Sequence, residues 1–289
     1  MNGDIRIITE DSEGYPPLLR EISQPPARLY IRGNLELLRH PRLLAVVGSR
    51  KASPYGKWCV TKLLPEAIAA GIPIVSGLAF GIDALAHRTC LKAGQPTVAV
   101  LGSGIDDVSI YPKSHISLAH QIIEEGGAIV SEYPPGTAGY KGHFPERNRI
   151  IAGLCQATII IQAASRSGSL ITARLALEAN REVGAVPGAV SDLLSAGTNQ
   201  LIKDGAAPIT SPADVAALYG IELVIKTPSP TFLSPQALTI LGKLTTTPQH
   251  IDEITAATSL PQTTVTTVLV ELELHDQIQH VGGMRYIKK

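Results

Sequence analysis

The chain has 289 residues, of which 44% are hydrophobic and 17% are charged, and its formal net charge is zero. This length accommodates one large core and a smaller second domain, and the apolar content excludes wholesale disorder. The zero net charge excludes a broad basic coat for nucleic acid, so a polyanion would have to bind in a local pocket.

Targeting and redox features favour a cytoplasmic protein. The chain has no run of the roughly 18 apolar residues that a transmembrane helix needs, and its start lacks the basic and apolar regions of a secretion signal. Cys59, Cys90 and Cys155 are scattered and form no CxxC pair. We therefore expect no disulfide framework, no metal site and no membrane contact.

Residues 1–40 contain the stretch YPPLLREISQPPARLYIRGN, with four prolines between short apolar runs. This pattern predicts a lead-in segment docked on the next domain, because it is too short and too interrupted to form a core of its own.

Residues 41–225 repeat one theme, in which a short apolar run ends in a Gly- or Ser-containing turn and an amphipathic stretch follows. The runs begin at Leu43, Ile72, Thr97, Ala128, Ala157, Glu182 and Ala207. Apolar runs without alternation indicate strands buried on both faces, and their alternation with helical segments predicts βαβ units. We expect an α/β domain with a Rossmann-like, doubly wound, mostly parallel sheet and ligands beyond the carboxyl ends of the strands.

The first strand-to-helix turn, Gly48-Ser49-Arg50, is a candidate anion site. Gly48 would let the backbone approach a ligand, the N–H groups of the next helix attract an anion, and Arg50 can hold a phosphate through two hydrogen bonds. An ordinary turn with a surface arginine explains these residues equally well.

The next two turns are less specific. In SGLAFGID, Asp83 is best interpreted as a helix-capping residue and not as a catalytic carboxylate. GSGIDDVSIYPK has a GxG without the third glycine of a dinucleotide fingerprint, and the chain has no GxxxxGK[ST] motif. Tyr111 and Lys113 could face the ligand crevice or lie in a solvated loop.

The stretch KGHFPERNR gathers basic and aromatic residues immediately before a long apolar run. Lys141, Arg147 and Arg149 could track phosphates. Phe144 could stack a base and Asn148 could orient these groups or bond a base edge. The alternative is a solvated loop that leads into a core helix, with Phe144 buried.

The turn SRSGS places Ser167, Gly168 and Ser169 at the expected start of another helix, where hydroxyls and free N–H groups can bind an anion. Helix capping alone would explain one serine. The chain lacks HExxH, GxSxG and paired-carboxylate motifs, and its histidines are dispersed. Several anion-binding turns without a nucleophile or base favour binding over catalysis, so we expect no enzyme.

Residues 226–235, rich in Pro, Ser and Thr, predict a linker. Residues 236–289 then predict three helices followed by a hairpin that turns at Gly282-Gly283 in two residues. We interpret this arrangement as a small C-terminal winged-helix domain.

Taken together, the motifs of this chain resemble those of the DprA/Smf family of DNA-processing proteins. The matching motifs span about Leu43 to Asp214 in the family's order, and the lead-in is also similar. They are VVGSR, SGLAFGIDALAHR, TVAVLGSGID…YP, SEYPPGT, HFPERNRIIAGL, SGSLITARLALE and AVPG…S.GTNQLI..GA. This series is highly specific.

The resemblance implies a Rossmann-like domain that binds single-stranded DNA without strong sequence preference. It also implies protection of incoming strands during natural transformation, loading of the recombinase RecA, a homodimer and no cofactor. Many members carry a helical domain before this unit, for which residues 1–40 are too few. The winged helix has similar numbers of acidic and basic residues, so we expect an accessory or protein-contact role for it.

The resemblance also assigns roles to residues. The arginine of the GSR turn, here Arg50, contacts DNA in the family, and a lysine near the fourth or fifth turn contributes, either Lys113 or Lys141. The FPxRNR segment corresponds to Phe144, Arg147, Asn148 and Arg149. The SGS turn corresponds to Ser167–Ser169.

Two alternatives belong to other classes. The fold expected here is similar to that of nucleoside-monophosphate phosphoribohydrolases, but their PGGxGTxxE signature is replaced by SGSLITARLALE, in which Glu178 is the only nearby acid. A winged-helix regulator with a ligand-sensing α/β domain is the other alternative, and the weakly charged third helix of the winged-helix domain argues against it.

Overall fold

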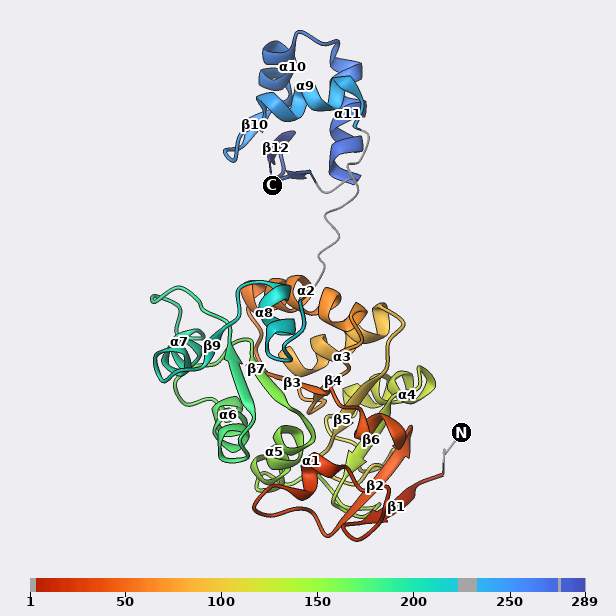
Figure 1. Ribbon diagram of the computed structural model, residues 1–289. Helices are drawn as coiled ribbons and strands as arrows, with labels where there is room; N and C mark the ends of the chain where they lie inside the picture. The colour runs from red at the N-terminus through yellow and green to blue at the C-terminus, as the bar shows by residue number, and fades with distance from the viewer. Residues whose placement is uncertain (1–3, 223–232, 275–276, 289) are drawn as a thin grey trace. The chain divides into compact units, whose positions relative to one another are not determined.

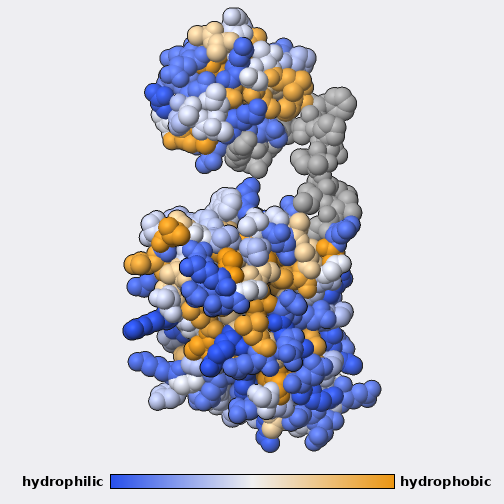
Figure 2. All heavy atoms as spheres, turned by 60° about the vertical axis from the view of Figure 1, so that its left-hand side comes forward, coloured by the Kyte–Doolittle hydropathy of each residue, from blue (hydrophilic) through white to orange (hydrophobic). Residues whose placement is uncertain are grey.

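The structure, a computed structural model, describes residues 4–222, 233–274 and 277–288. The chain divides into two compact units, Met1–Val224 and Ile225–Lys289, each with its own hydrophobic core. Most of the linker expected at 226–235 lies outside the described residues. Hydrophilic surface covers much of both units and is interrupted by apolar patches (Figure 2).

The larger unit is built on a nine-stranded sheet with the order β1-β2-β6-β5-β4-β3-β7-β8-β9. Its strands are β1 (Arg6–Thr9), β2 (Arg28–Gly33), β3 (Leu44–Val47), β4 (Ile74–Ser76), β5 (Thr97–Val100), β6 (Ala128–Ser131), β7 (Ala157–Ile160), β8 (Glu182–Ala185) and β9 (Ala207–Pro208). In this sheet order, all neighbouring strands from β6 through β3 to β9 are parallel. The pairs β1–β2 and β2–β6 are antiparallel. The mostly parallel α/β sheet is confirmed.

Helices cover both faces of this sheet (Figure 1). They are α1 (Pro17–Arg20), α2 (Pro54–Ala69), α3 (Ile82–Lys92), α4 (Ile116–Glu124), α5 (His143–Leu154), α6 (Gly168–Glu178), α7 (Ala196–Lys203) and α8 (Pro212–Ala217), with 3-10 turns η1 (Glu36–Arg39) and η2 (Lys113–His115). Alternate residues of β3 point to opposite faces. Leu44 and Val46 share a core with α2 and α3, and Ala45 and Val47 share one with α1, α5 and α6.

The first forty residues complete one edge of the sheet. β2 pairs with β6, with Ile31 opposite Val130, and β1 adds a hairpin outside it. Helix α1 packs on α5, where a Cβ at Gly153 would lie 2.8 Å from Leu19 Cδ1. This segment therefore shares the core of the larger unit.

Strand β3 occupies the position where the chain reverses direction across the sheet. The order from β3 to β6 runs one way, and β7 returns to the other side of β3, so β3 pairs with both β4 and β7. Such a switch point opens a crevice between the turns that follow its two strands, because their helices lie on opposite faces. Here those turns begin at Gly48 and Ile161.

The smaller unit contains α9 (Pro235–Lys243), α10 (Ile251–Thr258), α11 (Gln262–Leu274), β10 (Gln249–His250), β11 (Ile278–His280) and β12 (Arg285–Lys288). Its core includes Ile240, Ile254, Val265 and Leu269, and its strands form the order β10-β12-β11. The winged-helix fold is confirmed. The hairpin connection is longer than the two residues expected, because Met284 joins Gly282 and Gly283 at positive φ.

The described residues hold neither a cluster of ligands that could bind a metal ion nor a helix that is long and apolar enough to cross a membrane. Cys59, Cys90 and Cys155 are buried and unpaired. Burial raises the pKa of the Cys59 and Cys155 thiols, which disfavours their reactive thiolate forms.

Candidate nucleic-acid interface

An open pocket of about 590 Å³ lies at the carboxyl edge of the sheet, at the switch point between β3 and β7. The turn after β3 contributes Gly48–Arg50, and the turn after β7 contributes Ser167–Ser169. The first half of α5 contributes Phe144, Pro145, Arg147 and Asn148. Tyr111 and Lys141 complete the lining used below. We call this cavity the switch-point pocket.

Gly48 lies in the turn after β3, where neighbouring atoms leave no room for a side chain. A Cβ at this position would lie 2.8 Å from Ile82 Cγ1 and 3.0 Å from the Gln162 carbonyl oxygen. The Ser49 N–H donates to the same carbonyl oxygen at 2.7 Å, which joins the two turns of the switch point. The glycine is therefore needed for packing between β3, β7 and α3, and the approach of a ligand to it stays a prediction.

Arg50 is the free cation of this turn. Its side chain is exposed and forms no ion pair or hydrogen bond with any residue that the structure describes. The guanidinium carbon lies 5.4 Å from the centre of the Phe144 ring, within the range of a cation–π contact. This contact holds the guanidinium over the pocket while leaving its N–H groups available to an anion.

Phe144 is half-buried at the first turn of α5, and the Tyr111 ring packs on it with 5.5 Å between ring centres. The space for Phe144 comes from Gly102, where a Cβ would lie 2.9 Å from Phe144 Cδ1. The GxG after β5 thus accommodates a ring of the protein itself. Phe144 and Tyr111 both line the pocket beside Arg50, and aromatic rings in a pocket can stack an unpaired base.

Arg147 differs from the expectation of an outward, phosphate-tracking side chain. Only 4% of it is exposed, and its Nη1 donates to the carbonyl oxygens of Gly77, at 2.7 Å, and Val100. Gly77 has no room for a Cβ because the Arg147 guanidinium fills that space. Arg147 therefore joins the carboxyl ends of β4 and β5 from beneath the pocket. Burial lowers the pKa of Arg147 to about 10, so it stays charged at neutral pH.

Asp83 lies in the same layer. It is 5% exposed, and its Oδ2 accepts a hydrogen bond from the Gly77 N–H at 3.1 Å. Burial raises the pKa of this carboxyl, and the nearby Arg147 charge opposes the rise. The N-cap of α3 is Gly81 and carries no side-chain cap, so the capping expectation for Asp83 is wrong, but its contact with the turn that precedes its own helix is a structural role.

Arg149 and Lys113 lie outside the switch-point pocket. Arg149 donates to both carboxylate oxygens of Glu132, at 2.6 and 2.9 Å, and faces a separate hollow beside Ile22. Successive residues of a helix point about 100° apart, so Arg147, Asn148 and Arg149 cannot share one face. The assignment of Arg149 to the pocket is wrong for this reason.

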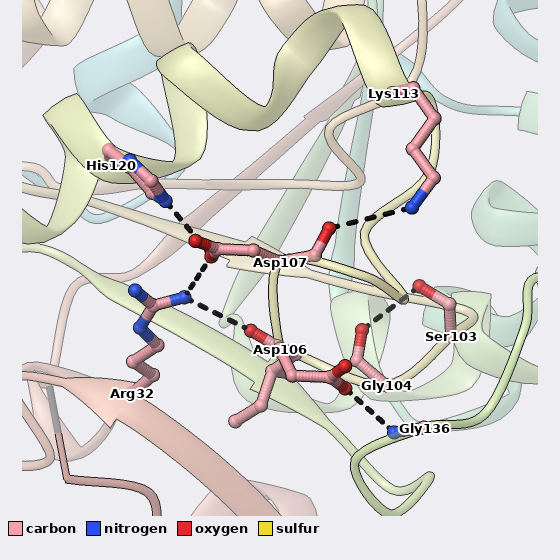
Figure 3. A network of polar contacts seen from close by, with 9 residues as sticks. Arg32, Ser103, Gly104, Asp106, Asp107, Lys113, His120 and Gly136 are labelled. Carbon is pink, nitrogen blue, oxygen red and sulfur yellow. Dashed lines mark hydrogen bonds and ion pairs between the residues drawn. The ribbon is translucent and has the colours of Figure 1, made fainter. Parts of the chain in front are cut away.

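Lys113 belongs to a polar network that anchors the loop after β5 (Figure 3). Its ammonium donates to the Val108 carbonyl oxygen. Asp107 accepts from Arg32 at 2.6 Å and from His120 at 2.9 Å, and these hydrogen bonds lower its pKa. The Asp106 carboxylate accepts from the Gly136 N–H at 2.8 Å. The network fixes the loop that carries Tyr111, and of the two candidate lysines only Lys141 lines the pocket.

The turn after β7 supplies the opposite wall. Ser167 caps α6 by accepting from the Ser169 N–H at 3.3 Å, and the two hydroxyl oxygens are 2.7 Å apart. The Asn148 amide donates to the Gly168 carbonyl oxygen at 3.4 Å. The first N–H groups of a helix have no partners within it, so this end of α6 favours an anion. Ser167 caps the helix as expected and the turn lines the pocket, and anion binding by the turn stays a prediction.

Sequence reasoning missed a cluster of aromatic rings around the basic stretch, whose members do not line the pocket. Tyr140 is 68% exposed beside Lys141, and the His143 ring stacks on Tyr133 at 4.0 Å between centres. Tyr140 also contacts His143 edge-on. The signal available was the clustering of aromatic residues around the basic stretch, but their spacing is irregular and matches no helix or strand period.

Comparisons with known proteins identify the family of both parts of the chain. A family model described as DNA recombination-mediator protein A matches residues 6–220, and one described as DprA winged helix domain matches residues 225–284. Protein Smf of Escherichia coli is 39% identical over 96% of this chain and 76% of its own length. DNA processing protein DprA of Streptococcus pneumoniae is 46% identical over 71% of each chain.

Two solved structures resemble the larger part of the chain. DprA from Streptococcus pneumoniae superposes with a TM-score of 0.69 at 43% identity, covering 75% of both chains. DprA from Helicobacter pylori, described for its single-stranded DNA binding mode, superposes with a TM-score of 0.66 at 32% identity, covering 76% of this chain and 99% of that one. On its domain matches and its relatives, the chain belongs to the DprA/Smf family of DNA recombination mediators.

Proposed function

We propose that the chain binds single-stranded DNA in the switch-point pocket. The observation that carries the proposal is the placement of Arg50, whose guanidinium lines the pocket over the Phe144 ring and forms no ion pair with a described residue. The related Helicobacter pylori structure is described for binding single-stranded DNA, which supports the same ligand here.

Phosphates and bases would meet different parts of the pocket. Arg50, Lys141 and the N-terminus of α6 offer charged or amide donors to phosphate oxygens, which carry no sequence information. Phe144 and Tyr111 offer ring faces, which accept any base. A duplex hides its base faces inside the stack, so this combination favours an unpaired strand without strong sequence preference.

Protection of incoming strands and delivery of them to the recombinase RecA follow from the family resemblance and extend this proposal. We also propose a homodimer on that ground. A direct test is whether the full chain speeds RecA filament formation on strands already coated with single-strand binding protein, and whether its mass in solution is that of two copies. Filament formation that is not accelerated would contradict delivery to RecA. A monomer at every concentration would contradict the homodimer.

A nucleotide-hydrolysing enzyme is the competing function. Glu178, the only acid near the matching motif, is at the opposite end of α6 from Ser167, is exposed, and pairs with Arg174. It does not line the pocket. This placement leaves the motif's acid far from the anion-binding turn and supports the binding function over hydrolysis.

The proposed function is tested by comparing full-chain affinity for oligothymidylate and for duplex DNA over a range of salt. We expect tighter single-strand binding, with a log–log salt slope of about −0.7 for each phosphate neutralised. Equal affinity for duplex, or no salt dependence, would contradict it. Steady release of free base from AMP or CMP in parallel incubations would favour the enzyme instead.

A further inference from the structure

A second hollow lies on the other side of Arg50 from the switch-point pocket. It is an open groove of about 550 Å³, formed by the start of α2, the turn after β4 and the first turns of α3. We call it the basic groove. Its polar lining is dominated by Arg50, Lys51, Lys57 and Arg88.

The basic groove has no counter-charge of its own. The lining includes no acidic residue, and Lys51, Lys57 and Arg88 form no ion pair with any residue that the structure describes. Their side chains are exposed. By contrast, Arg32, Arg149 and Arg181 elsewhere in the same unit each pair with a carboxylate. Cations gathered without partners attract a polyanion, because they raise its local concentration along the groove.

Phe80 is the exposed aromatic residue of the groove. It is 46% exposed, and its ring meets His115 edge-on at 4.9 Å between centres. Its turn is held tightly: Leu78, at the unusual φ of 55°, accepts a hydrogen bond from His115 Nδ1 at 2.8 Å through its carbonyl oxygen. A ring fixed in this way loses little conformational freedom when a base stacks on it.

The groove and the pocket adjoin at Arg50. A small hollow of about 20 Å³, with Arg50, Phe80, Tyr111 and Phe144 in its lining, lies beside both, and Arg50 lines all three spaces. Phe144 therefore stands on the pocket side of Arg50 and Phe80 on the groove side. A flexible single strand of DNA that contacts Arg50 could therefore extend into the switch-point pocket on one side and into the basic groove on the other.

We propose that the basic groove is a second subsite for the same single strand, in which Lys51, Lys57 and Arg88 contact phosphates and Phe80 stacks a base. This inference rests on the proposed function. It extends the binding path beyond the switch-point pocket and makes affinity depend on the length of the strand.

The test uses the full chain and oligothymidylates of about 4 to about 16 nucleotides, the range of single-strand site sizes known for other folds. Wild-type affinity should rise with length until both subsites are filled. Replacing Lys51, Lys57 and Arg88 together by Ala should remove the rise beyond the pocket and make the salt slope on long strands less negative by about 2. Phe80→Leu should cost about tenfold on long strands and little on short ones.

The matched control replaces Arg6, Arg28 and Lys203 by Ala. These exposed cations line neither the groove nor the pocket, and their replacement removes the same charge. Groove variants that bind long strands like this control, or that lose affinity equally at every length, would overturn the groove while leaving the pocket intact. A wild-type chain without single-strand binding at any length would overturn the proposed function as well.

Discussion

The rim of the switch-point pocket and the layer directly beneath it use similar residues in opposite ways. On the rim, Arg50 and Lys141 are exposed and form no ion pair with a described residue. In the layer beneath, Arg147 and Asp83 are buried and bonded to backbone groups of the turns after β4 and β5. The comparison teaches that one edge of a sheet can carry two kinds of polar group: exposed cations, which we propose contact the strand, and buried groups, which hold the turns in place.

The largest expected effect is on stability and comes from the supporting layer. Arg147→Ala leaves two buried carbonyl oxygens without a donor and removes a cation beside Asp83. We expect the free energy of unfolding of the larger unit to fall by about 3 kcal/mol, measured by urea unfolding. Arg147→Lys should recover only part of this loss, because an ammonium does not reproduce the fork of the guanidinium. Unchanged stability in Arg147→Ala would show that this layer does not support the edge.

The matching change on the rim should affect binding and spare stability. Arg50→Ala removes charge-assisted hydrogen bonds to phosphate, and we expect oligothymidylate affinity to fall about 10- to 150-fold. The urea midpoint should stay close to that of the wild type, because the exposed Arg50 side chain forms no hydrogen bond or ion pair with a described residue and contacts only the half-buried Phe144 ring. Fluorescence anisotropy gives the affinity, and Arg28→Ala is the control. A folded Arg50→Ala chain with full affinity would break the distinction between rim and support.

Two glycine substitutions sharpen the comparison. A Cβ at Gly102 would press on Phe144, whereas a Cβ at Gly168 meets no atom within 4 Å. Gly102→Ala should therefore cost about 1–3 kcal/mol of stability and weaken binding through a displaced ring. Gly168→Ala should leave stability unchanged or slightly higher. Similar stability in the two variants would mean that the GxG turn tolerates movement of α5.

The smallest expected effect is a pH dependence from beneath the sheet edge. The Thr97 hydroxyl donates to the Ile74 carbonyl oxygen, so it accepts from His87 Nδ1 at 2.9 Å, and the buried Nε2 has no partner. Burial lowers the pKa of His87 to about 3. The unfolded chain then takes up a proton that the folded chain refuses, so stability falls as the pH drops below the unfolded value near 6.5.

Between pH 7 and pH 6 this group alone should lower the free energy of unfolding by about 0.7 kcal/mol. His87→Gln removes the titration, so the difference in pH slope between variant and wild type isolates it. Identical slopes would show that His87 takes up protons equally in the folded and unfolded chains, which would contradict its lowered pKa.

The sequence predicts the strands and the fold well because both depend on short-range patterns. The run from Thr97 to Val100 is a buried strand as expected, and Val265, Val268 and Leu269 form the core side of their helix. The turns that follow parallel strands must also meet at one edge. Placing Arg50 and Ser167 in one pocket needs no more than this topology.

Side-chain direction and long-range packing could not be read in this way. Whether Lys141 or Lys113 reaches the pocket depends on a loop anchored by Arg32, far away in the sequence. The burial of Arg147 depends on space left by Gly77. Both are contacts between distant segments, and no local period reveals them.

The most direct measurement is photocrosslinking of the full chain to an oligothymidylate that carries 5-iododeoxyuridine, followed by mass spectrometry of the modified peptides. The aromatic residues beside Arg50 should react, so we expect adducts on Tyr111 or Phe144, and fewer of them in Arg50→Ala. Adducts confined to residues 233–288, or spread evenly over exposed aromatic residues, would contradict a single-strand site at the switch point.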